Sequence, residues 1–190
     1  MAGQARILSQ AEIRNLFQIL RNSRDQTLFA LGIYSGLRIG EIIAIKQSQV
    51  YTTSGGVKNA LKVVRQKTTQ TLYSDIPIHP KLRDQLSKYR EDVPKGTWLF
   101  PSDSAAGHLG RCRAHLILRN VDGLRLDDAS THSMRTCLTN MSRLGVPLRT
   151  IQEISGHSAL PNFKSTWRST QRISTKRLIY SDTDFYLNCQ

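Results

Sequence analysis

Three short segments of the chain carry side chains suited to chemistry on a phosphodiester. Residues 36–41 read Gly-Leu-Arg-Ile-Gly-Glu, residues 131–135 read Thr-His-Ser-Met-Arg, and residues 155–158 read Ser-Gly-His-Ser. Fixed cations facing the nonbridging oxygens stabilise the charge of a pentacovalent transition state. Arginine does this best because its planar guanidinium is always charged and binds oxygens in pairs. His132 and Arg135 are three residues apart near a predicted helix start, so they project from one face.

The order and spacing of these segments resemble the tyrosine recombinases, also called the phage integrase family. Members carry a first arginine in a motif like Gly-Leu-Arg-Ile-Gly-Glu, a lysine in a β-hairpin turn, a His-x-x-Arg pair and a later Gly-His-Ser motif. This chain matches all four in order, and the resemblance covers residues 8–160. No single motif is decisive, but the ordered set is specific. The resemblance implies a DNA-cleaving and DNA-rejoining catalytic domain.

The resemblance also assigns roles to five residues. Arg38, Arg135 and His157 would hold the scissile phosphate, and His132 would act as general base or phosphate donor. Lys67 would be the general acid that protonates the leaving 5′ oxygen. Neither a metal ion nor another cofactor is expected, and no ATP is needed because a phosphotyrosyl ester keeps the bond energy for religation. These five side chains are expected to converge on one concave basic surface.

Each of these residues also has a purely structural interpretation. Arg38 alone would more often be a surface or helix-capping arginine, and Lys67 has other basic residues nearby in Lys58, Lys62 and Arg65. His132 and His157 could be ordinary capping or core histidines. The remaining histidines belong to no motif and are expected to be structural: His79, His108 and His115. Glu41 is expected to brace Arg38 rather than to react.

The nucleophilic tyrosine of the family is absent from its expected place. It should lie nine residues after the histidine of the Gly-His-Ser motif, and 157 plus 9 is position 166, which is threonine. Trp167 cannot replace it. Beyond residue 160 the apolar periodicity also stops, and residues 161–190 form a basic tail rich in Ser and Thr.

A shifted reading frame near Pro161 would explain both features. Codons after Asn162, read from the third base of one into the next, can spell Leu-Gln-Lys-Tyr-Leu-Glu, with the tyrosine across Ser165 and Thr166. The same frame can stop across residues 181 and 182. The alternative is a genuine tail in which Tyr180, or less favourably Tyr186, enters a site of the same or another protomer.

Helices are predicted around the first motif. Ser9 and Glu12 have the spacing of a capping box, and apolar residues follow at helical spacing. Residues 27–34 form a second, mostly apolar helix, Ser35-Gly36 interrupts it, and helical character resumes over residues 37–43. Arg38 is therefore placed at a helix junction.

The rest of the pattern predicts a mainly α fold with one small antiparallel β-sheet. Residues 49–78 are expected to form about three strands, with a turn over residues 67–70. Further helices are expected over residues 81–89, 111–119, 133–144 and 148–155. This α+β pattern resembles the tyrosine recombinase catalytic domain. Residues 1–160 are expected to form that domain and residues 161–190 an atypical tail.

The charge of the chain favours a nucleic-acid partner. It holds 27 Lys and Arg against 14 Asp and Glu, with a formal net charge of +13 and a pI near 10.2. Such an excess binds polyanions, and double-stranded DNA is the expected partner. No run of 18 apolar residues and no signal peptide appear. Cys112, Cys137 and Cys189 suggest no disulfide framework, so we expect a cytoplasmic, nucleoid-associated protein without membrane attachment.

Several functions remain open at this point. The first is site-specific recombination through a 3′-phosphotyrosyl intermediate, with self-association on DNA as a dimer or tetramer. The second is a catalytically inactive DNA-binding module derived from a recombinase. A type IB topoisomerase shares the chemistry, but the Gly-His-Ser motif favours the recombinases. The catalytic pattern begins by residue 8, so the chain is expected to be either a fragment or similar to short recombinases of fimbrial phase variation.

Overall fold

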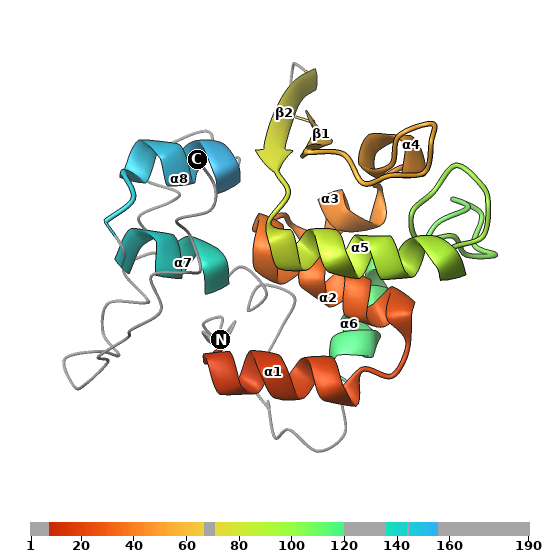
Figure 1. Cartoon of the computed structure of the whole chain (residues 1–190), viewed down its shortest axis with the longest axis horizontal. Coiled ribbons are helices and arrows are strands. Elements are labelled where there is room, and N and C mark those ends of the chain that lie inside the picture. Colours follow the sequence, from red (N-terminus) through yellow and green to blue (C-terminus); the bar gives the residue numbers. More distant parts are fainter. Residues whose placement is uncertain (1–7, 67–70, 120–135, 144, 156–190) are drawn as a thin grey trace.

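The structure is a computed structural model, and it describes residues 8–66, 71–119, 136–143 and 145–155. Its elements in chain order are α1 (Gln10–Ile19), α2 (Ser23–Ser35), α3 (Ile39–Ile43), α4 (Gln47–Val50), β1 (Ala60–Gln66), β2 (Thr71–Pro77), α5 (Pro80–Asp92), α6 (Arg111–Arg119), α7 (Thr136–Arg143) and α8 (Leu148–Ser155). The predicted fold, mainly helical with a small antiparallel sheet, is confirmed (Figure 1).

Helix α1 begins as its sequence predicts. Ser9 is the N-cap, its hydroxyl accepts a hydrogen bond from the Glu12 amide, and the Glu12 carboxylate accepts one from the Ser9 amide at 2.8 Å. This reciprocal cap satisfies amides that have no partner inside the helix. Ile13 and Leu16 face inward and are buried. The ring of Phe17 contacts Phe29 of α2 edge to face at 5.0 Å.

Helix α2 is the centre of the core. Nearly every residue from Thr27 to Ile33 is buried, which explains why its apolar residues surround the helix instead of forming one stripe. Helix α5 packs along it, with Leu82 and Leu86 buried in the contact (Figure 1). Helix α5 starts with Pro80, and the His79 side chain accepts a hydrogen bond from the Lys81 amide.

Two strands, and not about three, form the sheet of the described residues. β1 and β2 pair antiparallel from Ala60 opposite Pro77 to Gln66 opposite Thr71. The first segment of the expected sheet is instead the short helix α4, followed by a tight turn. The Thr52 amide donates to the Gly56 carbonyl at 2.8 Å, and Gly55 has a φ of +88°. Tyr51 and Val57 form an isolated antiparallel β-bridge across this turn, and too few residues lie beside the turn to form a longer strand.

A second, smaller apolar cluster joins α7 to α8. Its buried members are Cys137, Leu138 and Ile151. These two helices lie together beside the main helical core, and α7 packs against α2 (Figure 1). The described part of α7 and the whole of α8 agree with the predicted helices. In the part of the chain that the structure describes, no helix has the length and apolar character needed to cross a membrane.

Candidate active site

A sharp helix junction presents Arg38. Helix α2 ends at Ser35, and Gly36 then adopts a φ of +66°, which glycine reaches without the strain a side chain would bring. Leu37 is buried at 1% exposure and anchors the connection. Arg38 follows as the N-cap of α3, in extended conformation. The backbone therefore fixes where the Arg38 side chain starts, and 39% of that side chain stays exposed.

Glu41 braces Arg38, as its position in the motif suggested. One carboxylate oxygen, Oε2, accepts a hydrogen bond from the Arg38 amide at 2.7 Å. The other, Oε1, lies 3.5 Å from the Arg38 Nη1 atom. Only 17% of the Glu41 side chain is exposed, so water weakens this pair less than it weakens a surface ion pair. The amide hydrogen bond holds the Glu41 carboxylate in place, and its other oxygen orients the guanidinium, which stays partly open to a ligand.

A long-range hydrogen bond links Arg38 to the end of α8. The Arg38 Nη1 atom donates to the backbone carbonyl of Ser155 at 3.2 Å, across 117 residues of sequence. Ser155 is the last described residue of α8. Gly156 and His157 come next in the sequence. The first motif is therefore joined to the residue directly before the Gly-His pair.

The packing of α7 on the helix junction supports this link. A Cβ atom placed on Gly36 would lie 2.9 Å from Leu138 Cδ2 and 3.1 Å from Cys137 Sγ. The glycine thus permits both the left-handed turn and the close approach of α7. The Val146 amide donates to the Met141 carbonyl at 3.0 Å, which fixes the connection from α7 to α8. The described part of α7 starts at Thr136, the residue after Arg135 in the sequence.

The described part of the β-hairpin stops directly before the lysine that the sequence predicts to be catalytic. The last described pair is Gln66 opposite Thr71, and Lys67 is the next residue after β1. The base of the hairpin is tied to α4, because the Gln49 side-chain amide donates to the Lys62 carbonyl at 2.5 Å. Buried Leu61 and Val63 hold β1 against the core.

Of the predicted site residues, only Arg38 lies within the described residues. Outside them lie Lys67, His132, Arg135, His157 and Tyr180, and with them the proposed convergence on one concave surface. Two of the histidines expected to be structural have structural contacts. His79 caps α5 and its ring stacks on Tyr34 at 4.8 Å, while the His108 ring contacts Trp98 at 4.7 Å.

Three tyrosines of the helical core are unsuited to replace the missing nucleophile. The Tyr51 hydroxyl donates to the Leu86 carbonyl at 2.9 Å, and the Tyr89 hydroxyl to the Leu99 carbonyl at 3.0 Å. Burial raises the pKa of Tyr51, raises the pKa of Tyr89 to about 12, and raises the pKa of Tyr34. A raised pKa opposes formation of the phenolate, and backbone carbonyls hold the hydroxyls of Tyr51 and Tyr89.

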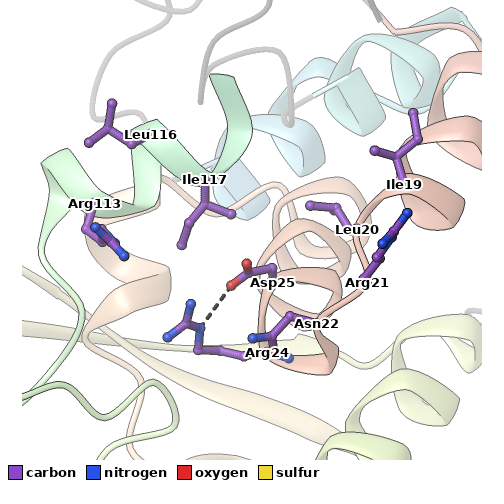
Figure 2. Close-up of a pocket in the computed structure, with 9 residues that line it drawn as sticks. All are labelled: Ile19, Leu20, Arg21, Asn22, Arg24, Asp25, Arg113, Leu116 and Ile117. Carbon is purple, nitrogen blue, oxygen red and sulfur yellow. Dashed lines mark hydrogen bonds and ion pairs between the residues drawn. The ribbon is translucent and has the colours of Figure 1, made fainter. Parts of the chain in front are cut away.

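A groove at the surface of the helical core is lined by several arginines. It has a volume of about 440 Å³ and lies between the end of α1, the start of α2 and α6 (Figure 2). Its apolar lining consists of Ile19, Leu20, Leu116 and Ile117, and Arg21 and Arg113 lie at its edges. Arg24 is paired with Asp25 at 2.9 Å. Arg38, the predicted catalytic residue that the structure describes, does not line this groove.

Comparison with known protein families identifies the family of this chain. The model of the phage integrase family matches residues 6–166 of the 190. The chain belongs to the phage integrase family. Among its curated relatives is the tyrosine recombinase XerD of Brucella abortus, which is 30% identical over 143 residues. That match covers 70% of this chain and 43% of XerD, so the chain spans less than half of that relative's length.

Solved structures of phage integrase family proteins have the same fold. The XerA recombinase superposes with a TM-score of 0.70 at 19% identity, covering 93% of this chain and 67% of XerA. A lambda integrase dimer bound to a COC′ core site superposes with a TM-score of 0.69 at 17% identity, covering 95% of this chain and 53% of that integrase. The predicted family and fold are both confirmed.

Ser155 is the contact of Arg38 that sequence reasoning missed. The Ser155 atom that contacts Arg38 is a backbone carbonyl oxygen, which every residue type has, so the residue type gives no sign of the contact. The available signal was position, because Ser155 directly precedes the Gly-His pair that the family motif contains.

Proposed function

We propose that this chain is a recombinase catalytic domain that cuts and rejoins duplex DNA at a specific site through a 3′-phosphotyrosyl intermediate. The observation that carries the proposal is the hydrogen bond from Arg38 Nη1 to the Ser155 carbonyl. It ties the first arginine of the motif set to the residue before Gly156 and His157. Two segments far apart in the sequence would thus act on one phosphate.

In this proposal each motif residue has one task. Arg38, Arg135 and His157 bind the nonbridging oxygens of the scissile phosphate and stabilise the charge that develops there. His132 assists as general base or phosphate donor. Lys67, at the end of the hairpin, protonates the leaving 5′ oxygen. Residues 1–160 form the catalytic domain, and residues 161–190 are the atypical tail.

The nucleophile is the open part of the mechanism. We favour a tyrosine encoded across Ser165 and Thr166 in the shifted frame, with Tyr180 as the alternative. The attack would form an ester between the phenolic oxygen and the 3′ phosphate and release the 5′ hydroxyl, which later attacks the ester to rejoin the strand. Exchange of strands needs more than one protomer, and the lambda integrase of similar fold is a dimer on its DNA site. We therefore propose self-association on DNA.

Salt dependence of DNA binding tests the first half of this proposal. The net charge of +13 predicts that affinity for duplex DNA, measured by fluorescence anisotropy, falls steeply as salt rises. Replacing Arg38 with Ala should weaken binding by about tenfold, as expected for the loss of one charge-assisted contact. It should also reduce the slope of log K against log salt by about 0.9. An affinity that does not change with salt would overturn the proposal.

A second function is favoured by one specific observation. Thr166 occupies the position where the family has its nucleophile. An aliphatic hydroxyl has a higher pKa than the roughly 10 of tyrosine and a shorter reach, so threonine is a poor substitute. The chain as printed could therefore be a DNA-binding module without strand-cleaving activity. Covalent trapping on a nicked DNA substrate separates the two functions.

A further inference from the structure

An arginine outside the motif set lies directly against the first motif. A Cβ atom placed on Gly40 would lie 2.8 Å from Nη2, 3.0 Å from Nε and 3.1 Å from Cζ of Arg111. One side of the Arg111 guanidinium therefore occupies the space that a side chain at position 40 would need. Arg111 is the first residue of α6, and α6 packs against α3. Gly40 comes two residues after Arg38, so the two arginines approach the same short segment.

Space, and not backbone conformation, is what this glycine provides. The described glycines with positive φ are Gly36, Gly55, Gly107 and Gly145, and Gly40 is not among them. It lies inside helix α3, where alanine would be the better helix former. The benefit of glycine here is the room it leaves for the Arg111 guanidinium.

The Arg111 side chain is available to an external anion. It is exposed, and among the described residues the ion pairs formed by arginine join Arg24 to Asp25 and Arg38 to Glu41, with no carboxylate on Arg111. Its backbone is held in place, since Ala114 one turn later is fully buried and its amide donates to the Gly110 carbonyl at 3.0 Å. An exposed guanidinium that no described carboxylate neutralises is suited to bind a phosphate.

We propose that Arg111 is a further DNA-binding residue, which binds a backbone phosphate close to the one that Arg38 binds. Gly40 leaves the space that the Arg111 guanidinium needs to lie near Arg38. This inference rests on the proposed DNA-binding function. It makes Gly40 a positioning residue, because it acts only through Arg111. The two arginines would then bind neighbouring phosphates and fix the register of the DNA over the site.

A double-mutant cycle tests whether Gly40 affects DNA binding through Arg111. Affinity for duplex DNA is measured by anisotropy over a range of salt concentrations for the native chain, Gly40→Ala, Arg111→Ala and the double variant. We expect Arg111→Ala to weaken binding by about tenfold and to lower the salt slope by about 0.9. Gly40→Ala should weaken binding in the native background and have no further effect once Arg111 is alanine.

Arg113→Ala is the matched control. Arg113 lies on the same helix, is exposed and carries the same charge, but it lines the groove between α1, α2 and α6 (Figure 2). Its loss should change affinity less than the loss of Arg111. Equal effects of the two variants, or a Gly40→Ala effect that persists without Arg111, would overturn the inference. If the native chain binds DNA with an affinity that does not depend on salt, the proposed function itself is contradicted. If the affinity does depend on salt but Arg111→Ala and Arg113→Ala weaken binding equally, only the inference about Arg111 is contradicted.

Discussion

Gly36 and Leu138 approach so closely that no side chain fits between them: a Cβ on Gly36 would lie 2.9 Å from Leu138 Cδ2. The contact joins the end of α2 to α7, whose described part starts at the residue after Arg135. The same residue ends α2 in a left-handed conformation with a φ of +66°. One glycine therefore determines both the direction of the Arg38 backbone and the distance to α7.

Replacing Gly36 with Ala should destabilise the chain by about 2–4 kcal/mol, because the new methyl group adds a steric clash to the strained backbone. Urea unfolding followed by circular dichroism measures this loss. Gly55→Ala is the matched control, since Gly55 has a φ of +88° but nothing within 4 Å of its Cβ position. It should lose only about 1–2 kcal/mol from backbone strain. Equal losses at the two positions would show that the α7 contact has no energetic role.

The small cluster between α7 and α8 should open more readily than the main core. Among the residues that the structure describes, it contains three buried ones, Cys137, Leu138 and Ile151, whereas α2 is buried over most of its length. Amide hydrogen exchange should therefore be faster in α8 than in α2. Ile151→Ala removes a fully buried side chain and should cost roughly 2–5 kcal/mol.

The effect of Ile151→Ala on DNA binding at the Arg38 site can be measured separately. Opening of α8 would remove the Ser155 carbonyl from Arg38, so DNA affinity should fall together with α8 protection. Exchange rates in α2 should change less than those in α8. Uniform loss of protection in both helices would contradict the view that α7 and α8 form a separable unit.

Alkaline pH should weaken the fold through Tyr89. Burial raises its pKa to about 12, with Arg24 opposing the rise, whereas in the unfolded chain the pKa stays near 10. The proton is thus held more tightly in the folded state. The stability that the Tyr89 hydroxyl contributes is fully present below about pH 10 and is lost as pH rises through about 12.

Comparing thermal unfolding of the native chain and Tyr89→Phe at several pH values tests this. Near neutral pH the variant should be less stable by about 1 kcal/mol, because it lacks the hydrogen bond to the Leu99 carbonyl. Above about pH 10 that difference should shrink. A difference that is constant from pH 7 to 12 would show that Tyr89 does not titrate in this way.

Local signals in the sequence predicted most of the helices. Ser9 and Glu12 marked the start of α1, Gly36 marked the end of α2, and α6 and α8 start at the expected residues. The expected third strand was wrong because the turn at Gly55 leaves too few residues for one. Alternating apolar residues indicate a strand, but the alternation does not show how many residues remain for strand pairing once a tight turn has formed.

The site was predictable only where residue type carries the information. The motif placed Arg38 at a helix junction beside Glu41, and both features are present. The Ser155 carbonyl could not be predicted, because its contact with Arg38 depends on how α8 packs 117 residues later. Arg111 belongs to no motif, and only the space at Gly40 shows its proximity to the site.

Covalent trapping of DNA tests the central claim most directly. A duplex with a nick next to the cleavage point loses the 5′ fragment that would rejoin the strand, so a phosphotyrosyl adduct accumulates and migrates as a shifted band on a denaturing gel. We predict that the chain as printed binds this DNA without a covalent band, and that a chain rebuilt as Leu-Gln-Lys-Tyr-Leu-Glu after Asn162 gives one. The band should disappear when Arg38 of the rebuilt chain is replaced with Ala. A covalent band from the printed chain that Tyr180→Phe abolishes would contradict the shifted-frame account, and no band from either chain would contradict the proposed recombinase chemistry.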